Sequence, residues 1–177
     1  LALWAGLDRV AVLALPSLDG VCVTWEQGEE GRAALLLSDQ LECYNDFLNG
    51  LFAPGIRKMT HGAKELCRTL LSEGIAPGGF VFDTEVAAYL LAPADGSYDL
   101  EKLGMTYFNH QFPKAADYLA DGAFGPLADL GTSAGAFLSH CALVAALKPV
   151  LTGRLKELGM WELYQTVELP LCSVLAE

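Results

Sequence analysis

Two acids, Asp83 and Glu85, are the first candidates for a catalytic role, because they follow a short β-type run in the order Asp-Thr-Glu. An Asp-x-Glu pair at a strand end is how two-metal nucleases present carboxylates to a pair of Mg²⁺ ions. Two ions ~3.5–4 Å apart need several carboxylates that converge from different elements. The next acids, Asp95 and Asp99, fall in a loop and at a predicted helix start. We therefore interpret Asp83 as a helix cap and Glu85 as a residue that complements the helix dipole.

A serine at position 133 is the second candidate, because residues 131–135 match the Gly-x-Ser-x-Gly pattern of a nucleophile elbow. No clear strand precedes this segment and no Asp follows Ser133. The one later histidine, His140, is expected on the same helix, whereas a catalytic triad needs its base and its acid from separate elements. We interpret the segment as a helix start with small residues for close packing.

The histidines and cysteines lack the spacing of metal ligands. Each tryptophan lies in an apolar run, which favours packing over base stacking. An odd number of scattered cysteines, five in all, argues against a disulfide framework and favours a reducing cytoplasm. The residues are His61, His110 and His140; Cys22, Cys43, Cys67, Cys141 and Cys172; Trp4, Trp25 and Trp161.

Three β-type runs, at residues 10–15, 21–25 and 33–37, open the chain and are joined by turn formers. A helix is predicted over 38–51, and a β-α-β pattern follows, with strands at 57–60 and 79–82 around a helix at 63–72. Further helices are predicted at 84–91, after Asp99, at 133–147 with a break or kink at Pro149, and at 160–177. Residues 109–131 show weak periodicity.

This order predicts an α/β fold with a mixed five-stranded sheet, three antiparallel strands followed by two parallel ones, flanked by helices. The 177 residues suit a single domain, 1–177. The chain starts without Met and stops inside an apolar-periodic stretch, so we expect a fragment excised from a longer polypeptide.

Charge and composition restrict the partners. The formal charge of −11 repels phosphate backbones, so independent nucleic-acid binding is disfavoured. An apolar content of 53% predicts that part of the surface is covered, for example by another domain. We find no apolar run near the ~20 residues that span a bilayer and no signal-peptide pattern, so we expect no membrane partner and a cytoplasmic location.

Two motifs carry a family resemblance. Residues 82–93 and 97–103 are similar to the "FDT-x-x-A-A-Y-L-L-x-P … Y-D-L-x-x-L" signature of the 3′–5′ exonuclease domain of bacterial family A DNA polymerase (DNA polymerase I). Residues 168–177 resemble the "E-x-P-L-x-x-V-L-A-x" helix that leads into the polymerase domain, so 160–177 is expected to start that helix. The resemblance implies an RNase H-like fold.

The resemblance also implies where four metal-binding acids and one tyrosine should lie. The Asp-x-Glu of the first strand falls on Ala14 and Pro16, the next acid on Leu66, and the last motif places Ala136 at the tyrosine and His140 at the aspartate. All four acids are therefore expected to be missing, with no metal and no cofactor bound in this domain.

What the resemblance implies for function is a degenerate, inactive proofreading domain that serves as a structural module beside the polymerase domain of the same chain. The parent would be a monomeric nucleotidyltransferase in DNA replication and repair. It would use Mg²⁺ and would bind DNA through parts of the protein other than this domain. Two alternatives stay open: an active metal-dependent 3′–5′ exonuclease that uses Asp83 and Glu85, and an acidic protein-interaction domain.

Overall fold

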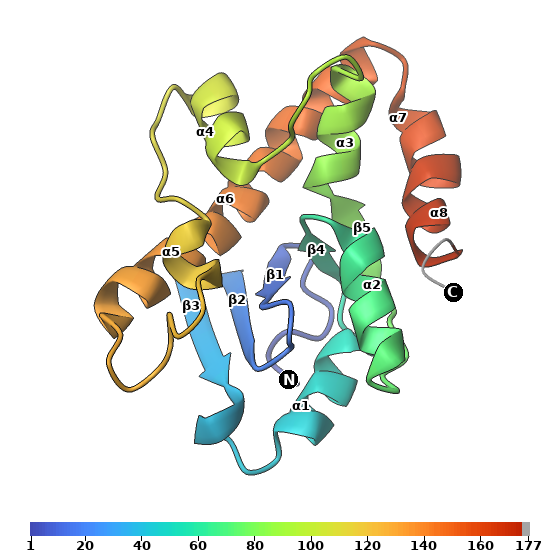
Figure 1. Cartoon of the computed structure of the whole chain (residues 1–177). Helices are drawn as coiled ribbons and strands as arrows, with labels where there is room; N and C mark the ends of the chain where they lie inside the picture. The colour runs from blue at the N-terminus through green and yellow to red at the C-terminus, as the bar shows by residue number, and fades with distance from the viewer. Residues whose placement is uncertain (175–177) are drawn as a thin grey trace.

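Alternating apolar runs form a sheet and amphipathic runs form the helices around it in the computed structural model, which describes residues 1–174 (Figure 1). The strands are β1 (Val10–Ala14), β2 (Gly20–Gln27), β3 (Glu30–Leu37), β4 (Lys58–Thr60) and β5 (Phe80–Asp83). The helices are η1 (Ser38–Gln40), α1 (Tyr44–Phe52), α2 (Ala63–Ser72), α3 (Thr84–Leu91), α4 (Leu100–Phe108), α5 (Ala116–Leu119), α6 (Leu130–Glu157), α7 (Trp161–Leu163), the π-helical η2 (Tyr164–Glu168) and α8 (Leu169–Val174).

The sheet has the strand order β3-β2-β1-β4-β5. Short turns join β1 to β2 and β2 to β3, and both pairs are antiparallel. β4 lies parallel to β1, and β5 lies parallel to β4 after the α2 crossover that such a pair requires. The predicted mixed sheet, three antiparallel strands followed by two parallel ones, is confirmed.

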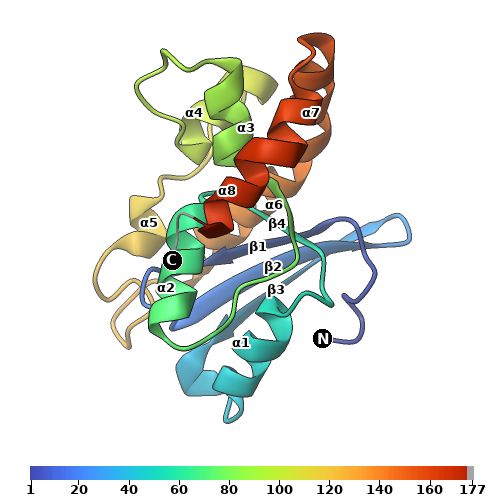
Figure 2. The same cartoon turned by 90° about the vertical axis from the view of Figure 1, so that its right-hand side faces the viewer.

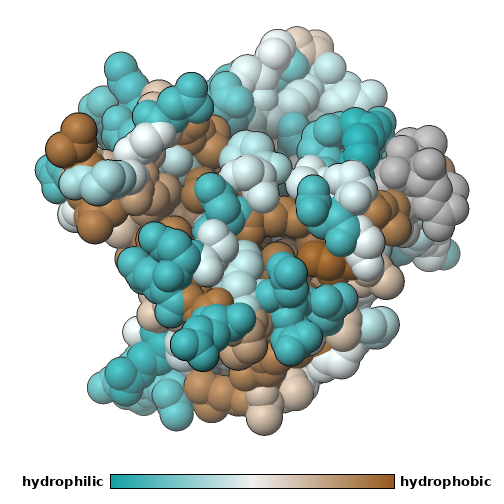
Figure 3. All heavy atoms as spheres, turned by 60° about the horizontal axis from the view of Figure 1, so that its bottom comes forward, coloured by the Kyte–Doolittle hydropathy of each residue, from teal (hydrophilic) through white to brown (hydrophobic). Residues whose placement is uncertain are grey.

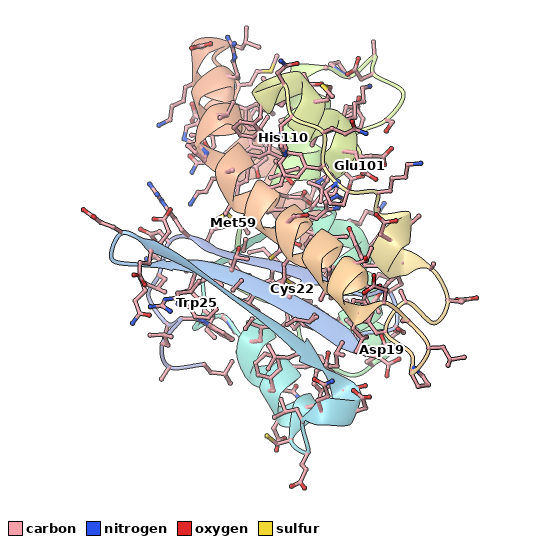
Figure 4. The ribbon with its side chains drawn as sticks, turned by 90° about the vertical axis from the view of Figure 1, so that its left-hand side faces the viewer. Asp19, Cys22, Trp25, Met59, Glu101 and His110 are labelled. Atoms are coloured by element: carbon pink, nitrogen blue, oxygen red, sulfur yellow. The ribbon has the colours of Figure 1, made fainter. Side chains whose placement is uncertain are left out.

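The apolar first strand is buried on both faces, which explains why it has no polar alternation. Ala11 and Leu13 pack into the cluster beneath α6, whereas Val10 and Val12 pack on the α1 side. Figure 2 shows α6 and α1 on opposite sides of the sheet, and Figure 4 shows α6 crossing the strand that carries Cys22. Helices on both faces therefore fix the position of β1.

The longest helix, α6, runs through Pro149 without a break, so the predicted end at residue 147 is wrong. An interior proline costs ~3 kcal/mol, but buried leucines on both sides of it, Leu147 and Leu151, hold the two halves in the core. α6 is also long and apolar enough to cross a membrane by length and composition, contrary to our expectation of no such run. Because it packs across the sheet, we assign it as a core helix.

Three further expectations need correction. The predicted helix over 38–51 is a short 3₁₀ turn followed by α1. Asp99 sits at the start of α4, but its side chain accepts a hydrogen bond from the Ser97 hydroxyl and does not cap the helix. The predicted last helix contains the π-helical η2, and its end, 175–177, lies outside the described residues.

Candidate functional site

The end of β1 opens into a pocket of about 320 Å³ between the β1–β2 turn and α2. Ala14 and Pro16 line it from the strand side, and Leu66 lines it from α2. The structure thus gathers three of the four positions at which the resemblance places metal-binding acids. We call this the β1 pocket.

Several polar groups of the β1 pocket have partners within the chain. Of the described residues that line it, Glu65 is the one carboxylate, and both of its oxygens lie 2.7 Å from Arg68 Nη1. The Thr60 hydroxyl donates to the Val12 carbonyl at 2.8 Å. Mg²⁺ and Ca²⁺ need several oxygen ligands, so this lining does not fit the pair of cations that the resemblance implies. Within residues 1–174 no group of three or more His, Cys, Asp or Glu side chains could hold a metal ion.

His140, at the position of the fourth acid, is fully buried on α6, and its ring is fixed by two hydrogen bonds. Nε2 lies 2.7 Å from the Pro113 carbonyl, which can only accept, so Nε2 carries the proton. Nδ1 is then the acceptor of the Tyr118 hydroxyl at 2.9 Å. With both nitrogens occupied, the imidazole has no lone pair left for a metal.

Ala136 lies one helical turn before His140 and is also buried, at 2% exposure. It offers a methyl group where the resemblance places a tyrosine. The aromatic hydroxyl beside His140 comes instead from Tyr118 of α5, whose ring stacks on Phe137 at a centroid distance of 4.7 Å. Burial raises the pKa of Tyr118, so its phenol stays neutral and remains the donor to His140.

His61 is a polar residue of the β1 pocket that the sequence interpretation left unassigned. Its Nδ1 lies 2.9 Å from the Thr84 hydroxyl, and burial lowers its pKa, so the ring is neutral near pH 7. His61 directly follows β4, the parallel neighbour of β1. The carboxyl ends of parallel strands meet at one edge of a sheet, and that rule could have placed His61 here.

Asp83 is fully buried at the end of β5 and binds backbone groups only. One oxygen accepts from Gly62 N at 3.1 Å and from Glu85 N at 2.9 Å, with Val86 N at 3.5 Å, and the other accepts from Ala63 N at 2.7 Å. It therefore caps α3, as predicted, and also holds the start of α2. A carboxylate used in this way has no geometry left for bridging two metals.

The Gly-x-Ser-x-Gly segment is the first turn of α6, capped by Asp129, so its interpretation as a helix start is confirmed. Ser133 is buried, and His140 cannot serve as its base, because Tyr118 and Pro113 occupy both nitrogens of the ring.

The remaining histidine and the tryptophans pack against aromatic rings: His110 on Phe112, Trp4 on Trp25, and Trp161 on Tyr164. The tryptophans therefore serve packing, as predicted.

A second hollow of about 430 Å³ shares Leu15 and Pro16 with the β1 pocket and is walled by residues 118–125. Its carboxylates are Asp19, Asp39 and Asp121. Figure 4 shows Asp19 at the edge of the sheet where α6 begins. Three acids around one opening give this surface a negative potential, which repels a phosphate backbone.

Comparison with known proteins gives a consistent fold. No protein-family model matches the sequence, and no curated protein matches it. A structure described as the POL domain of Pol1 from M. smegmatis in complex with DNA primer-template and dNTP superposes with a TM-score of 0.75 at 21% identity, over 99% of this chain and 29% of that one. The chain thus spans less than a third of that polymerase chain.

Two further solved structures have the same fold. Brucella melitensis NrnC gives a TM-score of 0.71 at 17% identity, over 97% of this chain and 85% of that chain. Escherichia coli RNase D is described as an exoribonuclease involved in structured RNA processing. It gives a TM-score of 0.70 at 16% identity, over 96% of this chain and 44% of that chain. The expected RNase H-like architecture is confirmed, and the chain has the fold of the 3′–5′ exonuclease domains.

Proposed function

We propose that this chain is a 3′–5′ exonuclease-type domain of a DNA polymerase I that has lost its metal site and acts as a structural module beside the polymerase domain. In this proposal the parent protein is a cytoplasmic, monomeric DNA polymerase that uses Mg²⁺ in its polymerase domain. The present domain contacts DNA only through the parent.

The observation that carries the proposal is the composition of the β1 pocket. Ala14, Pro16 and Leu66 place alkyl groups where a two-metal site needs oxygen ligands, and His140 is locked between Tyr118 and Pro113. Without those ions, these residues cannot supply the rate acceleration of two-metal hydrolysis. The rate of phosphodiester hydrolysis should therefore be lower by several orders of magnitude.

Exposed apolar side chains support the docking role. Leu163, Val167 and Leu171 recur every four residues along α7, η2 and α8, and their exposures are 44%, 42% and 37%. Such spacing places them on one side of the helical segment. Figure 3 shows brown apolar surface between hydrophilic groups on the side that comes forward when the bottom of Figure 1 is turned toward the viewer. A neighbouring domain is the occupant that we propose for the stripe on the C-terminal segment.

Tyr164 holds this C-terminal segment on the sheet. Its hydroxyl accepts from Asp83 N at 2.7 Å and donates to the Asp83 carbonyl at 3.1 Å, and its ring lies against Phe82 at 5.2 Å. The segment is thus anchored at β5 while the apolar stripe faces outward, which suits a connection to a further domain.

The alternative of an active nuclease built on Asp83 and Glu85 has less support, because Asp83 is buried and engaged by backbone N–H groups. The acidic hollow beside the β1 pocket fits the other alternative, an acidic interaction domain, as well as it fits a silent module. An assay on the full-length parent protein separates the three.

The test uses a labelled primer with a mismatched 3′ end on a template. We expect the full-length parent to extend a matched primer with Mg²⁺ and deoxynucleoside triphosphates, and to leave the mismatched end uncut with Mg²⁺ or Mn²⁺. Removal of the mismatch, abolished by Glu85→Gln, which leaves the Asp83 cap intact, would establish the nuclease alternative. Failure to extend the matched primer would remove the polymerase context.

A further inference from the structure

A pocket of about 360 Å³ lies between α2, α3 and α8, away from the β1 pocket, and Leu171 of the apolar stripe forms one of its borders. Its lining combines two tyrosines with acids and one base. The residues are Lys64, Asp83, Glu85, Val86, Tyr89, Tyr98, Glu168 and Leu171. Glu85, which the sequence first suggested as a metal ligand, belongs to this pocket.

The two tyrosines form a corner. Tyr89 of α3 and Tyr98 of the following loop have ring centroids 5.9 Å apart and planes at 85°, so their faces stand at right angles. The Tyr98 hydroxyl donates to the Ala92 carbonyl at 2.7 Å, which fixes that ring. Aromatic faces carry negative potential, and cages of this kind bind cations over the rings.

The charge around the Tyr89–Tyr98 corner favours a cation as well. Three acids and one base, Lys64, are among the described lining residues; backbone N–H groups engage Asp83, so Glu85 is the carboxylate that we assign to a ligand. Partial desolvation raises the pKa of Glu85, and the neighbouring carboxylates of Asp83 and Asp99 raise it further. Glu85 makes no ion pair with a described residue.

We propose that this corner binds an organic cation, the guanidinium of an arginine side chain presented by another polypeptide segment. A guanidinium is planar and weakly hydrated, so it stacks on a tyrosine face while its N–H groups bond a carboxylate. Tyr89 and Tyr98 supply the aromatic faces, Glu85 supplies the carboxylate, and Leu171 bounds the pocket for the alkyl stem. The inference is independent of the state of the β1 pocket.

The test is a proton NMR titration of the 177-residue chain with N-acetylarginine amide, followed through the ring-current shift of its side-chain protons. We expect an upfield shift and a dissociation constant on the order of 1–10 mM, since one ion pair and one cation–π contact give weak binding. N-acetylcitrulline amide, the neutral analogue of the same shape, should bind at least ~5-fold more weakly. Equal binding of the two amides would overturn the proposal.

Matched variants assign the binding to the pocket. Tyr89→Leu and Glu85→Gln should each weaken binding ~3-fold or more, whereas Tyr89→Phe and the remote Glu162→Gln should leave it unchanged. Lys64→Gln should strengthen binding because it removes a like charge. Unchanged binding in both Tyr89→Leu and Glu85→Gln would refute the site. Tighter binding of spermidine than of the arginine amide at equal ionic strength would refute arginine as the ligand.

Discussion

The carboxyl ends of β1 and β5 lie at the same edge of the sheet. Each lacks a different one of the two features that a carboxylate metal site needs, an open pocket and free acid oxygens. The β1 end has an open pocket but apolar walls, formed by Ala14, Pro16 and Leu66. The β5 end has the acid, Asp83, but its oxygens are consumed by the N-termini of α2 and α3. A metal site needs free carboxylate oxygens that converge, and neither strand end supplies both conditions.

The largest effect that tests this comparison is expected for Asp83→Ala. The variant removes the acceptor for four backbone N–H groups at two buried helix starts, so the free energy of unfolding should fall by about 3–5 kcal/mol. Urea denaturation followed by circular dichroism measures it. Asp83→Asn keeps one acceptor oxygen, so its free energy of unfolding should lie between that of Asp83→Ala and that of the wild type. A loss below ~1 kcal/mol would mean that the carboxylate is not a structural cap.

Substitutions at the His140 position should have the next largest effect. His140→Leu leaves the Tyr118 hydroxyl and the Pro113 carbonyl without their partner, and we expect a loss of about 2–4 kcal/mol in unfolding free energy. Tyr118→Phe removes one of the two hydrogen bonds and should cost about 1–2 kcal/mol. A double-mutant cycle on this pair should show coupling, and strict additivity would show that the hydrogen bond contributes nothing.

The pH dependence of stability should report His61. Burial holds its folded-state pKa below the unfolded value of ~6.5, so the unfolded chain binds a proton first as the pH falls. The His61 contribution is present above pH ~6.5 and is lost below it, by up to ~1.4 kcal/mol per pH unit. Denaturation at pH 7 and pH 5 should therefore show a smaller loss for His61→Gln than for the wild type. Equal losses would place His61 in solvent.

The smallest effect is expected for the acid that is next to Asp83 in sequence. Glu85 is exposed and makes no ion pair with the rest of the described chain, so Glu85→Gln should change the unfolding free energy by less than ~0.5 kcal/mol. The contrast with Asp83→Ala, in the same denaturation experiment, separates a capping acid from a surface acid. Similar losses in both variants would contradict this distinction.

Most of the fold follows from the sequence because local signals agree with it. The apolar run of β1 and the turn formers at Ser17 and Gly20 define the antiparallel strands, and the Asp83 cap defines α3. Predictions from residue propensity were wrong where tertiary packing outweighed the propensity. α6 is the example, because it continues through Pro149 with buried leucines on both sides.

The site was only partly predictable. Ala14, Pro16 and Leu66 were placed through the resemblance, and the structure brings them to one pocket. The hydrogen bonds of His140 could not be predicted, because Tyr118 and Pro113 come from a segment with weak periodicity. The Tyr89–Tyr98 corner depends on how a loop folds back on α3, which the sequence pattern does not encode.

Divalent cations should not bind at the end of β1, and titration calorimetry with Mn²⁺ measures whether they do. The wild-type chain should show no saturable binding at millimolar Mn²⁺, and a variant with Ala14→Asp, Pro16→Glu, Leu66→Asp and His140→Asp should gain it if it folds. Saturable Mn²⁺ binding by the wild type, together with metal-dependent shortening of labelled single-stranded DNA, would contradict the account.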